Sequence, residues 1–127
     1  MTIDRYDPLM APDAKQWLAT DEGERIQLAL EYHTRARVKL PNATVHATVH
    51  VIVENQIALG DETPVRLKAS QLMAQGLDRH EAIHAIASVL IGHLTEVMKN
   101  PEPAADANQR YYAALDRLNA RKWLRSG

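Results

Sequence analysis

The sequence predicts an all-α protein, a compact bundle of five or six helices that forms a single domain over residues 1–127. Segments of helical length alternate with short runs of turn residues, and strand patterns are nearly absent. A chain of 127 residues is long enough for one hydrophobic core and too short for two comfortable ones. We expect the histidine-bearing core of this domain at about residues 42–98.

Two helices are expected in the first third of the chain. A short helical turn covers PDAKQWL, where Pro12 suits the first helical position. A longer helix covers DEGERIQLALEYHTRAR and begins near Asp21. His33 lies on this core-packed helix beside Glu31, so we interpret it as a core residue or a residue behind the site, with a role as an extra ligand as the alternative.

The third helix is predicted to follow a break at LPN, with Asn42 as its capping residue. It runs through ATVHATVHVIVENQIAL to Gly60 and is rich in β-branched residues, so a strand is the rival interpretation. The apolar residues do not alternate. They fall on a helical stripe, which favours the helix: Val45, Val49, Ile52, Val53 and Ile57.

Three further helices are expected after the turn GDETP. VRLKASQLMAQ forms a short helix that ends at Gly76. The next helix begins at Asp78, runs to about Lys99 and is closed by NPEP. A final helix covers about Ala104 to Arg125. One face of this last helix is apolar and carries Tyr112, Leu115 and Leu118.

Six histidines are many for so small a protein, and four of them form two pairs with the same i, i+4 spacing. Residues four apart on a helix are separated by only about 40° around its axis. His46 and His50 lie inside and beside the apolar stripe of their helix. His80 and His84 hold the same offset from the stripe of theirs, which comprises Ile83, Ile86, Ala87, Leu90, Ile91, Leu94 and Met98. If the two helices pack together, the four imidazoles can converge.

This convergence predicts a metal site with His46, His50, His80 and His84 as ligands. The chain has no cysteine, so nitrogen and oxygen atoms must hold any metal, and imidazole is a good ligand for zinc and other divalent transition metals. The alternative is two sets of half-buried histidines that hydrogen bond to carbonyls or carboxylates. Two matched pairs favour the metal. His93 lies on the opposite flank of its helix from His84 and is interpreted as a surface or interhelical residue.

The string HEAIH, residues 80–84, also matches the H-E-x-x-H motif of zinc metalloproteases, in which the glutamate activates a water molecule. Glu81 could act in this way as a catalytic base. Asp78 with Glu81 three residues later is equally a capping box. The longer metalloprotease motif would need Gly and His where this chain has Ala87 and Leu90, and there is little sheet to hold a peptide. We therefore interpret the string as a metal-binding turn of helix.

The two histidine motifs together resemble an uncharacterised bacterial family, domain of unknown function 1841, in which a HxxxH helix with a nearby glutamine precedes a HExxH helix. His46, His50 and Gln56 match the first element, and His80, Glu81 and His84 match the second. The resemblance covers roughly residues 42–98. It implies a helical bacterial protein and supplies no reaction.

Several functions are compatible with such a site. The first is a metal-dependent hydrolase, with Glu81 or Glu54 as the base on a metal-bound water. The second is a metal-binding protein without catalysis, in which the ion stabilises a small core. An oxygen-activating iron site ranks last, because such bundles use more carboxylates than can be assigned here. A structural or interaction module without metal is the simplest alternative.

The net charge of −1 and the mixed charges give no indication of a nucleic-acid partner. The first residues lack the apolar stretch of a signal peptide, and no segment is apolar enough to span a bilayer. The sequence thus predicts a cytoplasmic protein with no membrane association, whose partner is a metal ion. It does not decide between a monomer and a dimer.

Overall fold

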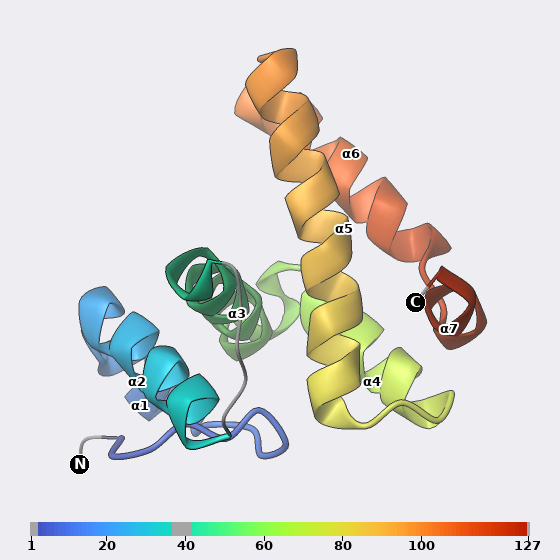
Figure 1. Cartoon of the computed structure of the whole chain (residues 1–127). Coiled ribbons are helices and arrows are strands. Elements are labelled where there is room, and N and C mark those ends of the chain that lie inside the picture. The colour runs from blue at the N-terminus through green and yellow to red at the C-terminus, as the bar shows by residue number, and fades with distance from the viewer. Residues whose placement is uncertain (1–2, 37–41, 127) are drawn as a thin grey trace.

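The computed structural model describes residues 3–36 and 42–126, and the secondary structure within these ranges is entirely helical (Figure 1). The prediction of an all-α bundle is confirmed. Leu40 and Pro41, part of the predicted break, lie outside the described residues. The α-helices are α1 (Ala14–Ala19), α2 (Glu22–Arg35), α3 (Ala43–Ala58), α4 (Val65–Ala74), α5 (Arg79–Lys99), α6 (Ala104–Arg117) and α7 (Ala120–Ser126), and a 3-10 turn spans Gly60–Glu62.

Four of these helices begin at a side chain that caps them. Asp13, Asp21, Asn42 and Asp78 each accept a hydrogen bond from a backbone N–H in the first turn of the helix that follows. The predicted starts at Asp21, Asn42 and Asp78 are therefore confirmed. The prediction for Pro12 was wrong, because Asp13 takes the capping position and Pro12 precedes the helix.

The final helix was predicted as one element and is two. Leu118 adopts an extended conformation, with φ −73° and ψ 133°, and ends α6. Its carbonyl accepts a hydrogen bond from Lys68 Nζ at 2.9 Å, and Gln75 Oε1 accepts one from Ala120 N–H at 2.8 Å. Asn119 Oδ1 accepts from Lys122 N–H at 2.9 Å inside α7. The break follows from contacts with α4 and the segment after it, which a local pattern does not reveal.

Helices α3 and α5 lie at the centre of the molecule and pack against each other (Figure 1). On one side, α1 and α2 pack against α3; on the other, α6 packs against α5. Helix α4 contacts both central helices. None of the helices in the described ranges is both long and apolar enough to cross a lipid bilayer.

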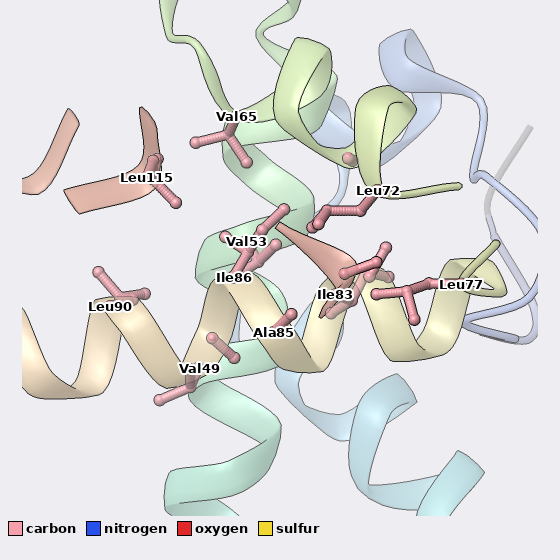
Figure 2. Close-up of a cluster of buried hydrophobic side chains, with 14 of the residues drawn as sticks. Val49, Val53, Val65, Leu72, Leu77, Ile83, Ala85, Ile86, Leu90 and Leu115 are labelled. Atoms are coloured by element: carbon pink, nitrogen blue, oxygen red, sulfur yellow. The ribbon is translucent and has the colours of Figure 1, made fainter. Parts of the chain in front are cut away.

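Two clusters of buried apolar side chains flank α3. The larger cluster joins α3, α4, α5 and α6, and Figure 2 shows its members gathered between these helices. The smaller cluster joins α1, α2 and α3 and contains Tyr6 and Trp17. Helix α3 supplies Val49 and Val53 to the first cluster and Val51 to the second. A helix buried on several sides is apolar all round, which explains its run of β-branched residues.

The predicted apolar stripes are partly wrong. Val45, the first member of the stripe on α3, is 52% exposed. On α5 the stripe is buried as far as Leu90, while Ile91, Leu94 and Met98 are exposed. Figure 1 shows the second half of α5 extending beyond α3, with α6 beside it.

Three consecutive polar residues on α3 bind three different parts of the structure. The carboxylate of Glu54 binds Arg79 of α5, and Asn55 Oδ1 accepts from the indole of Trp17 on α1 at 2.8 Å. Gln56 Oε1 accepts from the hydroxyl of Tyr111 on α6 at 2.8 Å. Neighbouring helical residues point about 100° apart, so these three side chains leave α3 in three directions.

Candidate metal centre

Five histidines from three helices meet between the two apolar clusters. His33 comes from α2, His46 and His50 from α3, and His80 and His84 from α5. The ring centre of His50 lies 4.9 to 5.3 Å from the ring centres of the other four histidines. The four predicted ligands are therefore brought together, and His33 joins them.

The protonation of His50 follows from its neighbour Tyr6. The Tyr6 hydroxyl donates its proton to Glu54 Oε2 at 2.6 Å, because an ionised carboxylate can only accept. That hydroxyl lies 3.2 Å from His50 Nδ1 and can only accept from it. His50 Nδ1 therefore carries the proton, and the lone pair of Nε2 faces the centre of the cluster. A hydrogen bond of this kind behind a ligand fixes the tautomer that metal binding requires.

The same reasoning applies to His33. Its Nδ1 lies 2.6 Å from the carbonyl oxygen of Ala29, which accepts, so Nδ1 is protonated and Nε2 bears a lone pair. His33 is only 4% exposed, and its Nε2 has no hydrogen-bond partner among the described residues. The Nε2 atoms of His46 and His80 are also buried without a partner there. Three such atoms in one place are unusual, since buried polar atoms are normally satisfied.

The Nε2 atoms of His50 and His84 lie 3.1 Å apart. Because His50 offers a lone pair, His84 Nε2 carries a proton and donates to it. Two nitrogens bound to one tetrahedral zinc ion lie about 3.3 Å apart, given Zn–N distances of about 2.0–2.1 Å. A metal ion could therefore take the place of the shared proton with small movements of the two rings.

Burial favours the uncharged form of four of these histidines, His46, His50, His80 and His84. Burial first, and then the charges of neighbouring histidines, lower the pKa of His46 and of His84 to about 4. The pKa of His50 falls to about 2 for the same two reasons, burial first. Burial also lowers the pKa of His80. At neutral pH these rings are neutral, with one proton on each, and neutral imidazole is the form that binds a metal.

Glu54 is held by a buried ion pair behind the cluster. Arg79 donates two hydrogen bonds to its carboxylate, at 2.7 and 2.8 Å, and a third to the carbonyl of Pro8. Burial alone would lower the pKa of Arg79, but its hydrogen bonds to Glu54 outweigh this and raise it. Glu54 is 1% exposed and engaged by Arg79 and Tyr6, so it orients the site and is not free to act as a base.

Glu81 lies on the exposed side of α5. Asp78 accepts a hydrogen bond from Glu81 N–H at 2.8 Å, which is one half of the predicted capping box. In the other half, Glu81 would fold back to the start of its own helix. Instead its Oε2 accepts from the indole N–H of Trp123 on α7. The tertiary contact with α7 replaces the local one.

A pocket of about 260 Å³ opens beside three of the histidines, His46, His50 and His84. The remainder of its lining is mostly apolar and includes Val49, Ala87, Ile91 and Trp123. A metal held by these three histidines would therefore be reachable by a small ligand from the pocket. His33 and His80 are not part of the pocket wall.

Several residues fall outside the centre or were missed in the sequence. His93 stacks on Tyr111 of α6, with ring centres 5.4 Å apart, which confirms that it lies between helices. Gln56 binds Tyr111 and does not reach the histidines. Tyr6 and Arg79 were not identified, because neither carries a spacing signal. The position of His33 on the buried face of its helix was the only local sign of its role.

Comparisons with protein-family models, with curated proteins and with solved structures gave no match to this chain. The resemblance to domain of unknown function 1841 thus stays a prediction. What the centre can do follows from its geometry alone.

Proposed function

We propose that this protein binds a divalent transition metal ion, zinc foremost, in the centre formed by His33, His46, His50, His80 and His84. One observation carries the proposal: three buried Nε2 atoms without a hydrogen-bond partner among the described residues belong to histidines of this one cluster. Leaving such atoms unsatisfied costs free energy, and a bound cation would remove that cost.

The donor set suits this class of metal. Neutral imidazole is a strong ligand for zinc, copper and nickel, while magnesium and calcium prefer oxygen. The Tyr6–Glu54 pair behind His50 resembles the carboxylate-backed histidines of known zinc sites in its physical effect, because it raises the basicity of the ligand. Zinc is also the ion least dependent on a particular geometry.

Metal binding is better supported than hydrolysis. A hydrolase would need a base close to a metal-bound water. Glu54 is engaged by Arg79 and Tyr6, and Glu81 accepts a hydrogen bond from Trp123. Both carboxylates proposed for that role therefore have other partners, and the proposal stops at binding.

Elemental analysis of the protein purified without a histidine tag tests the proposal. We expect about one transition metal ion per chain, or binding of one equivalent of zinc by calorimetry after treatment with a chelator. His50→Ala should weaken zinc binding at least about a hundredfold, because the rings of the other four histidines all lie around His50.

His93→Ala is the matched control, since it removes a histidine from α5 outside the centre. It should leave zinc binding unchanged. Wild-type protein that takes up no metal from a panel of zinc, copper, nickel and cobalt would disprove the proposed function. So would equal zinc binding by wild type and His50→Ala.

A further inference from the structure

The five histidines form two overlapping sets of three, and His50 belongs to both. The ligand atoms of His46, His50 and His84 all lie within 4.8 Å of one another, and so do those of His33, His50 and His80. We call the first set the outer triad, because all three members line the pocket, and the second the inner triad. Three protein ligands usually hold a zinc ion that keeps an open position, and three imidazoles are one such set.

The two triads cannot be filled together. His50 Nδ1 faces the hydroxyl of Tyr6, so His50 has only the lone pair of Nε2 for a metal. One such lone pair binds one ion at a time. Occupation of the inner triad therefore excludes full occupation of the outer one.

The two triads differ in how readily an ion from solution can reach them. The outer triad faces the pocket, and in its member His84 the ring proton must move from Nε2 to Nδ1 before Nε2 can bind an ion. In the inner triad, His33 is 4% exposed, and the Nε2 atoms of His33 and His80 are buried and unpartnered among the described residues. The outer triad is the position that an ion from solution meets first. The inner triad is where binding satisfies two orphaned atoms at once.

We propose that the centre loads its metal in two steps, first at the outer triad and then at the inner triad, with His50 holding the ion throughout. In the second step, the bonds from His46 and His84 break as those from His33 and His80 form. The number of imidazole ligands stays at three, so no charge is created in the buried site. This proposal rests on the proposed function and adds a route and a final position for the ion.

Rapid mixing of metal-free wild-type protein with Co²⁺ tests the proposal, because the visible absorption of Co²⁺ reports its ligands and Co²⁺ commonly replaces zinc. We expect two phases. The rate of the first should rise in proportion to the Co²⁺ concentration, and the rate of the second should be independent of it. Binding in a single phase at every concentration would overturn the two-step route.

Two double variants separate the triads. His33→Ala/His80→Ala keeps the outer triad and should bind one equivalent of Co²⁺ in the first phase alone. His46→Ala/His84→Ala keeps the inner triad and should still bind one equivalent, but about tenfold or more slowly, because the entry ligands are gone. Loss of binding in either variant, with the helical circular dichroism of wild type, would show that both triads act as one site.

A double variant that does not fold leaves the wild-type kinetics as the deciding measurement, and the corresponding glutamine replacements keep a polar side chain in the core. Wild type that binds two Co²⁺ ions per chain would also overturn the proposal, since the triads would then fill together. Each of these results leaves the proposed function intact. Only a wild-type protein that binds no metal would disprove both the proposed function and the two-step route.

Discussion

The hydroxyl of Tyr6 decides which nitrogen of His50 faces the other histidines. It accepts from His50 Nδ1 because its own proton is given to Glu54, and Glu54 is fixed by Arg79. Three side chains from three parts of the chain thus set the tautomer of His50. Burial, then the charge of Glu54, raises the pKa of Tyr6, so the phenol keeps its proton.

Tyr6→Phe should leave the fold in place and weaken zinc binding roughly 10- to 100-fold, the usual loss when the partner behind a histidine ligand is removed. Without the phenol, His50 can protonate either nitrogen, and Glu54 loses one of its donors. We expect a loss of about 1–2 kcal/mol in the free energy of unfolding. Calorimetric zinc titration and urea unfolding measure the two effects.

Tyr112→Phe is the control for this substitution, because it removes a phenol hydroxyl from α6, which carries no histidine of the centre. Zinc binding that is the same in Tyr6→Phe, Tyr112→Phe and wild type would show that Tyr6 does not orient His50.

Four of the five histidines could be predicted because i, i+4 spacing is a local property. Two such pairs on helices that pack together can meet, and α3 and α5 do pack together. His33 has no partner on its own helix, so its place depends on how α2 packs against α3. Tyr6 lies 44 residues from His50, and nothing in the intervening sequence indicates that they touch. Contacts of this kind are set by tertiary packing.

At the scale of the elements, the end of α4 shows how a local signal can suffice. Gly76 has a positive φ of 109°, a backbone angle that residues with a side chain rarely adopt. Its N–H donates to the carbonyl of Met73, and the N–H of Leu77 donates to that of Leu72. Leu72 and Leu77 are both buried in the larger cluster. These are the two bonds and the apolar contact of a Schellman motif.

Gly76→Ala should therefore lower the free energy of unfolding by about 1–2 kcal/mol, because alanine is strained at this φ. A Cβ at Gly76 meets no atom within 4 Å, so the cost comes from the backbone and not from a clash. Chemical denaturation measures it, and zinc binding should not change.

Gly92→Ala provides the opposite case. Gly92 lies inside α5, and a Cβ there also meets no atom within 4 Å. Alanine should raise the free energy of unfolding by about 0.5–1 kcal/mol, since glycine is the poorer helix former. A stabilising Gly76→Ala would contradict the assignment of its conformation.

The boundaries of the other helices are likewise set either by contacts near in sequence or by contacts with distant segments. Helix starts at Asp21, Asn42 and Asp78 could be predicted because a capping residue acts within its own turn. The break between α6 and α7 could not, because it depends on Lys68 and Gln75 of distant segments. The link between Glu81 and Trp123 was hidden for the same reason, and it displaced a local capping bond that the sequence favoured.

For the whole molecule, the buried histidines couple stability to pH. In the unfolded chain their pKa values return to about 6.5, while in the folded protein those of His46 and His84 are about 4 and that of His50 is about 2. Between these limits the unfolded chain binds more protons. Stability is thus fully present above about pH 6.5 and is lost as the pH falls toward the folded-state values.

We expect the metal-free protein to lose stability steadily from pH 6.5 to pH 5, with about 2 kcal/mol of the loss arising from His50 alone. Urea unfolding in the presence of a chelator measures it. His50→Gln has one fewer depressed pKa, so its stability should fall less steeply over this range. If the free energy of unfolding depended equally steeply on pH in wild type and variant, the lowered pKa assigned to His50 would be contradicted.

The three polar residues at the end of α3 have a further consequence for the whole molecule. Because α3 supplies apolar side chains to both clusters, burial alone distinguishes poorly between different rotations of this helix about its axis. Glu54, Asn55 and Gln56 each find their partner in only one orientation. Their contacts fix the rotation of α3 about its axis, and this rotation turns His46 and His50 toward α5.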